Sequence, residues 1–183
     1  MTRRVWPFAV IMLAAVAALA VAAVLLQRAG DSDVVPVDDA AERQRIGAAA
    51  MALVSFDPAR VGYAVTFAPG RVGLRAQTDR SARAITVYLR DGDAPHVVAH
   101  DVAHELGHAF DMARMDDAAR MSFLAARGVP GAAWNPTGAS DYAAGAGDFA
   151  EVFALCFSAS PDFRSELAPR PENPCELLPR EVL

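Results

Sequence analysis

All four histidines of this chain fall at intervals of four residues, and they are His96, His100, His104 and His108. On an α-helix, residues four apart differ by 40° of rotation and lie one turn above each other. The four imidazoles would therefore form a stripe along one helix face. The pattern predicts a helix over 95–112, directly after 84–89, the segment of the chain with the strongest β propensity.

Part of this stripe is an HExxH motif, in which His104 and His108 flank Glu105. Two imidazoles on one helix face, one turn apart, are arranged as two nitrogen ligands of a tetrahedral zinc require. Glu105 lies 100° from His104, beside the metal, where it can take a proton from zinc-bound water and pass it to a leaving amine. The motif predicts one Zn²⁺ per chain. We expect His100 to be a buried supporting or packing residue.

A catalytic zinc needs a third protein ligand and an open position for water. The longer motif HExxHxxGxxH is absent because Asp111 and Arg114 occupy its last two conserved positions, and no histidine remains elsewhere. A predicted helix over 148–158 offers two carboxylates, Asp148 and Glu151. Either one could be the third ligand, and Asp148 could instead cap the start of the helix.

The remaining pattern predicts an α+β domain: a small sheet of about three strands packed on the HExxH helix, followed by the acidic helix. Gly107 indicates that the HExxH helix packs closely against another backbone. The other predicted helices cover 39–53 and 116–127, and the predicted strands cover 63–67, 72–77 and 84–89.

The N-terminus carries an apolar run from Val5 to Leu26, preceded by Arg3 and Arg4 and followed by Arg28. Its 22 residues would span roughly 33 Å as a helix, the thickness of a bilayer core. The arginines favour a cytoplasmic N-terminus and an exported body. We expect a single-pass anchor over 1–29, a linker over 30–38, a domain over 39–160 on the extracytoplasmic side and a Pro-rich tail over 161–183.

The competing interpretation is a cleaved signal peptide, because Ala18-Leu19-Ala20 supplies small residues of the kind that a signal peptidase accepts. The domain would then be secreted. In an exported protein Cys156 and Cys175 either form a disulfide that ties down the tail or stay as two thiols. The net charge is −5, there is no lysine, and all 22 acidic residues lie beyond residue 28. This balance argues against a nucleic-acid partner.

The segments HELGHAFD and GDFAEVFA together resemble gluzincin-type metallopeptidases. They are similar to the catalytic domains of anthrax lethal factor and the Pro-Pro endopeptidases, and to small uncharacterised actinobacterial zinc peptidases. The resemblance covers roughly 84–158. In that family the second helix commonly reads ExxxE: the first Glu binds zinc and the second acid supports a ligand histidine. Here Gly147 stands at the first position and Glu151 at the second.

The resemblance also implies a tyrosine before the second helix that stabilises the oxyanion, and Tyr142 is the matching residue. It further implies that the edge strand before the HExxH helix, here Ile85 to Leu89, pairs with an extended substrate. The function that follows is an exported, membrane-anchored zinc endopeptidase acting on a peptide or protein substrate. The alternative is a catalytically inactive zincin-fold module that binds a partner in the cell envelope, which the departure at Gly147 favours. Hydrolysis of small-molecule amides would use the same chemistry.

Overall fold

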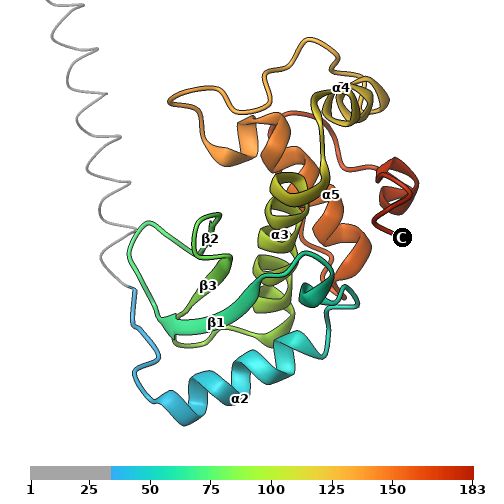
Figure 1. The fold of residues 1–183 in the computed structure, drawn as a ribbon. Coiled ribbons are helices and arrows are strands. Elements are labelled where there is room, and N and C mark those ends of the chain that lie inside the picture. Colours follow the sequence, from blue (N-terminus) through green and yellow to red (C-terminus); the bar gives the residue numbers. More distant parts are fainter. Residues whose placement is uncertain (1–33) are drawn as a thin grey trace, which may run out of the picture. The chain divides into compact units, whose positions relative to one another are not determined.

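The computed structural model describes residues 34–183, which form an α+β domain with a three-stranded mixed sheet and four α-helices (Figure 1). The predicted N-terminal anchor lies outside the described residues. Within them, no helix has both the length and the apolar character that crossing a membrane requires.

The domain has four α-helices, which are α2 (Ala40–Met51), α3 (Pro95–Arg114), α4 (Asp117–Ala126) and α5 (Gly145–Phe157). Short 3-10 turns are η1 (Pro58–Arg60), η2 (Asp141–Ala143) and η3 (Pro174–Leu177). The strands are β1 (Ala64–Pro69), β2 (Ala76–Asp79) and β3 (Ala84–Leu89).

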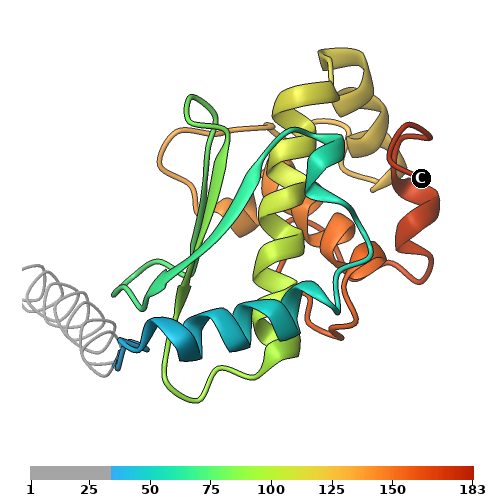
Figure 2. The same ribbon diagram turned by 60° about the horizontal axis from the view of Figure 1, so that its bottom comes forward.

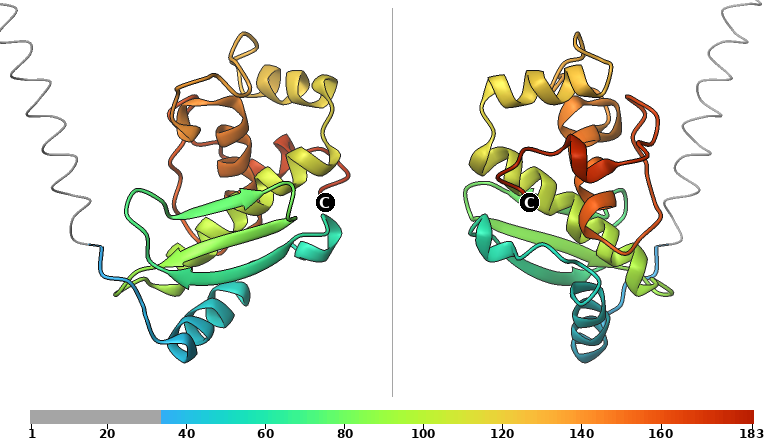
Figure 3. Two further views of the ribbon diagram at one scale, coloured as in Figure 1. Left: turned by 60° about the vertical axis from the view of Figure 1, so that its left-hand side comes forward. Right: turned by 90° about the vertical axis from the view of Figure 1, so that its right-hand side faces the viewer.

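The sheet has the order β1-β3-β2, so that β3 is its central strand (Figure 3, left). It pairs in parallel with β1 and antiparallel with β2. Ile85, Val87 and Leu89 are fully buried, as the alternation of a half-covered strand requires. The expectation that Ile85 to Leu89 forms an edge strand is therefore wrong. Among the described residues, the edges are β1 and β2.

The edge strand β2 starts later than the predicted strand over 72–77. Gly73 has a positive φ of 71°, and Arg71 bridges to Leu74, so the chain turns before it extends. The main-chain N–H of Tyr88 donates to Arg75, next to Ala76 at the start of the strand. Because hydrogen bonding alternates along an antiparallel pair, the main-chain groups of Ala76 and Thr78 face the free edge.

The long helix α3 lies between the sheet and α5 (Figures 1 and 2). It crosses α5 closely at Gly107, where an added Cβ would lie 2.8 Å from Cα of Ala150. This confirms that Gly107 allows a second backbone to approach. The close crossing holds α5 against the histidine face of α3, because larger residues at this point would push the two axes apart.

Helix α5 begins at Gly145, three residues before the predicted start, and without a side-chain cap. The main-chain N–H groups of Gly145 and Ala146 donate instead to the carbonyls of Ala133 and Trp134. These carbonyls of the preceding loop satisfy donors that the first turn of a helix leaves unpaired. The loop is thereby attached to the N-terminal end of α5.

The C-terminal tail packs against α5 (Figure 3, right). A disulfide joins Cys156 on α5 to Cys175 on η3, which decides between the two states considered for this pair. Leu178 and Val182 are buried in the core, although no helix or strand is formed between Ala159 and Asn173. The tail is therefore an integral part of the domain.

Candidate metal and catalytic centre

The histidine stripe of α3 divides by burial. His96 is exposed at the start of the helix, His100 and His104 are buried, and His108 is half-buried near the far end. His104 and His108 turn toward each other, with their Nε2 atoms 3.2 Å apart. The HExxH spacing therefore brings two ring nitrogens to one point, as the helical geometry predicts.

A carboxylate from outside α3 completes this group. Asp141, in η2, places its Oδ2 atom 2.8 Å from Nε2 of His104 and 3.2 Å from Nε2 of His108. The side chain of Asp141 is 45% exposed, so the group lies at the protein surface. Sequence reasoning missed this residue, because a single aspartate in a loop without regular structure carries no positional signal.

A second carboxylate reaches the same histidine from the other side of its ring. Oε1 of Glu151, on α5, lies 2.8 Å from Nδ1 of His104 and 3.0 Å from Nε2 of His100. A carboxylate only accepts hydrogen bonds, so both ring nitrogens donate to it. Its other oxygen, Oε2, accepts the main-chain N–H of Arg164. Glu151 thus fixes the ring of His104 so that Nε2 faces Asp141 and His108.

Charge and burial shift the ionisation of these groups. Burial raises the pKa of Glu151, but the hydrogen bonds from His100 and His104 outweigh it and lower the pKa to about 2. Burial lowers the pKa of His104, but its two carboxylate partners raise it well above the ordinary value. The hydrogen bonds with both histidines likewise outweigh burial at Asp141 and hold its pKa below the usual range. The centre therefore favours a positive charge between its carboxylates.

Within the part of the chain that the structure describes, two overlapping groups could hold a metal ion, and they share His104. The group of His100, His104 and Glu151 is buried, and both oxygens of Glu151 already accept hydrogen bonds. The group of His104, His108 and Asp141 borders the solvent. A catalytic metal needs a position open to water, which only the second of these two groups offers.

The two candidate catalytic residues, Glu105 and Tyr142, have different partners in the structure. Glu105 is almost completely buried and faces β2, where the hydroxyl of Thr78 donates to its Oε2 atom over 2.6 Å. The same hydroxyl lies 3.1 Å from the main-chain oxygen of Glu105. The ring of Tyr142 stands 5.7 Å from that of His104, and its hydroxyl is 3.5 Å from Nη1 of Arg164. Tyr142 thus adjoins His104, whereas the carboxylate of Glu105 is turned toward β2.

Asp148 lies apart from the histidines. Its carboxylate is fully buried, accepts two hydrogen bonds from the guanidinium of Arg127 at 2.7 and 3.0 Å, and accepts a third from the hydroxyl of Ser165. It makes no cap at the helix start. This position corrects the expectation that Asp148 could bind the metal: it faces α4 and the tail, about 60° around the helix from Glu151.

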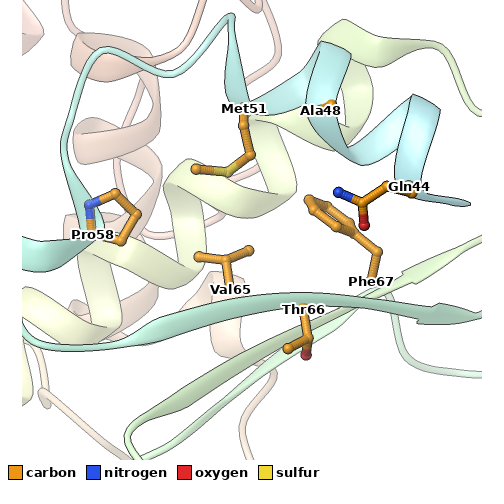
Figure 4. A pocket seen from close by; sticks show the side chains of 7 residues that line it. All are labelled: Gln44, Ala48, Met51, Pro58, Val65, Thr66 and Phe67. Atoms are coloured by element: carbon orange, nitrogen blue, oxygen red, sulfur yellow. The ribbon is translucent and has the colours of Figure 1, made fainter.

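A separate groove of about 480 Å³ lies between α2 and β1 (Figure 4). It contains none of the histidines or of the acidic residues described above. Its lining residues are Gln44, Ala48, Met51, Pro58, Val65, Thr66 and Phe67.

Comparison of the chain with protein-family models, with curated proteins and with solved structures finds no match.

Proposed function

We propose that this protein is a zinc-dependent endopeptidase of zincin-like fold, exported and anchored in the membrane by its N-terminal apolar run. The observation that carries the proposal is the pair of Nε2 atoms of His104 and His108, which lie 3.2 Å apart on a helix whose motif glutamate, Glu105, is buried. Nitrogen ligands of a tetrahedral zinc, at bonds of about 2.0–2.1 Å, are separated by about 3.3 Å. The donor type and the spacing therefore fit this metal.

Bound zinc would supply Lewis acidity, polarising the scissile carbonyl and making water nucleophilic near neutral pH. The protein would supply the proton transfers through Glu105, which accepts a proton from the attacking water and donates it to the leaving amine. Thr78 orients this carboxylate by its hydrogen bond to Oε2. Tyr142, whose ring lies beside that of His104, would donate a hydrogen bond to the developing oxyanion.

The position of β2 at the edge of the sheet, as far as the described residues show, supports the proposal that the substrate is a peptide. The main-chain groups of Ala76 and Thr78 face this edge, and Thr78 also holds Glu105. An extended peptide that adds to the edge as a further strand would lie along the side of the sheet nearest to the catalytic carboxylate. The sequence led us to expect that Ile85 to Leu89, in β3, would pair with the substrate. Because β3 already has a partner strand on each side, we assign this role to β2 instead.

Substitution Glu105→Gln tests this function in the full-length, zinc-loaded protein, with a mixture of unstructured peptides as substrate. We expect hydrolysis to fall by about 10²–10⁴-fold, the usual contribution of a general acid–base group, while one zinc per chain is retained. Cleavage is followed by mass spectrometry and zinc by atomic emission. Glu172→Gln, at an exposed position, is the matched control and should hydrolyse peptides like the wild type.

Hydrolysis that survives Glu105→Gln with zinc bound would contradict the assigned mechanism. A wild-type protein that binds zinc and cleaves none of the peptides would favour the binding module of the cell envelope instead.

A further inference from the structure

We propose that Asp141 is the third protein ligand of the metal held by His104 and His108, and that Gly147 is the residue that makes room for it. This inference rests on the zinc-dependent function proposed above. It assigns the site a complete set of three protein ligands, two imidazoles and one carboxylate, drawn from α3 and from the turn before α5.

The geometry of three donor atoms supports the assignment. Nε2 of His104, Nε2 of His108 and Oδ2 of Asp141 form a triangle with sides of 2.8, 3.2 and 3.2 Å. Three ligands of one tetrahedral zinc would form a triangle with sides of about 3.3 Å. A cation at the centre of this group would satisfy three electron-rich atoms at once, and the exposed side of Asp141 leaves a direction open to water.

The glycine at position 147 provides a second, independent observation. A Cβ atom built there would lie 2.0 Å from the main-chain oxygen of Asp141 and 3.0 Å from its Cγ atom. No side chain can therefore be present at position 147 while Asp141 keeps this position. The resemblance places a ligand glutamate at position 147, and here the main chain of Asp141 fills the space which that side chain would need. The carboxylate thus comes from the preceding turn.

The two carboxylates suggested by the sequence are both occupied in other ways. Glu151 accepts a hydrogen bond from Nδ1 of His104, the nitrogen opposite the one that faces His108, and its second oxygen accepts from Arg164. Glu151 therefore supports the ligand His104 through the ring nitrogen that points away from the metal. Asp148 forms an ion pair with Arg127 and contacts none of the histidines. Of the three acids considered, Asp141 alone contacts Nε2 of both His104 and His108.

Zinc binding by the full-length chain tests the proposal, measured by competition against a chromophoric chelator, with Zn²⁺ alone as the probe. We expect Asp141→Ala to lose more affinity than the roughly 10–100-fold that follows loss of an outer hydrogen-bond partner of a metal ligand. Gly147→Ala should weaken binding by at least the roughly 10-fold that disturbing the support of a metal ligand costs, because it displaces Asp141. Glu151→Gln should fall within the 10–100-fold range. The absorption spectrum of bound Co²⁺ should change with Asp141→Ala, since a ligand is lost.

Two matched controls accompany these variants. Asp91→Ala removes an exposed aspartate, and Gly131→Ala adds a methyl group where no atom lies within 4 Å. Both should bind zinc like the wild type, and thermal unfolding in EDTA checks that each variant is folded.

Each outcome separates the ligand assignment from the proposed function. If the wild type binds zinc and Asp141→Ala binds it equally well, the assignment is wrong while the zinc site stands. Loss of binding with Glu151→Gln but not with Asp141→Ala would place the metal in the buried group with His100. A wild type that binds no zinc would overturn both proposals.

Discussion

Two acidic residues of α5 serve different parts of the protein although only three positions separate them. Asp148 and Glu151 are both fully buried, and each accepts hydrogen bonds at both of its oxygens. Glu151 faces the histidines of α3, whereas Asp148 faces Arg127, whose side chain is 5% exposed. A rotation of about 60° between the two positions accounts for the division, because α5 is covered on both sides.

Asp148→Asn should therefore destabilise the fold without weakening zinc binding. The substitution leaves the guanidinium of Arg127 buried without its counter-charge, a change that costs on the order of 3–5 kcal/mol. Urea unfolding of the metal-free protein measures the free energy, and chelator competition measures the zinc affinity. Asp117→Asn is the control, since this carboxylate is 92% exposed in its pair with Arg120 and should change the stability little. Loss of zinc binding with unchanged stability would show that Asp148 is a metal ligand.

At the scale of elements, the centre depends on how closely α3 and α5 approach each other. Gly107 lets the backbone of Ala150 come within reach of the histidine face, and the next residue along α5, Glu151, then contacts His100 and His104. The motif glycine is thus a packing residue. It carries a helix-propensity cost of about 1 kcal/mol relative to alanine.

Gly107→Ala should lower the stability despite the better helix propensity of alanine. The added Cβ atom would lie 2.8 Å from Cα of Ala150 and 3.1 Å from Cβ of Phe153, so the helices must separate. Overpacking of this kind costs about 1–3 kcal/mol, which exceeds the gain in propensity. Thermal unfolding measures the loss, with Gly131→Ala as the control in open space. A more stable variant would show that the crossing can relax freely.

At the scale of the whole molecule, the C-terminal tail connects the core to the metal centre. The segment that the Cys156–Cys175 disulfide closes carries Arg164, whose main-chain N–H donates to Glu151, and Ser165, whose hydroxyl donates to Asp148. The guanidinium of Arg164 also pairs with Asp101 on α3. The tail therefore contacts both buried acids of α5, Asp148 and Glu151.

Removal of the disulfide by the double substitution Cys156→Ala and Cys175→Ala should destabilise the protein. A crosslink that closes a loop of this length contributes roughly 3 kcal/mol by restricting the unfolded chain. Because buried Leu178 and Val182 also anchor the tail, we expect a folded protein with a lower unfolding temperature. Differential scanning calorimetry measures the shift. An unchanged unfolding temperature would show that these apolar contacts alone fix the tail.

The sequence by itself determined the features that depend on local geometry. Helical periodicity is a property of neighbouring residues, so the stripe of histidines predicted α3 and the convergence of His104 and His108. The strong β propensity of the segment 84–89 predicted β3 with its observed bounds, Ala84–Leu89. Burial of His100 and the close packing at Gly107 followed from the same helix.

The tertiary structure alone decided the features that depend on distant residues. The neighbours of β3 are set by strand pairing, which placed it at the centre of the sheet and left β2 at the edge. The early start of α5 depends on the carbonyls of Ala133 and Trp134, which no local pattern reveals. Asp141 reaches the histidines because the chain path through that loop brings it into the space beside Gly147. A loop residue acquires its role from the packing of the elements around it, whereas a helical residue carries its direction in its spacing.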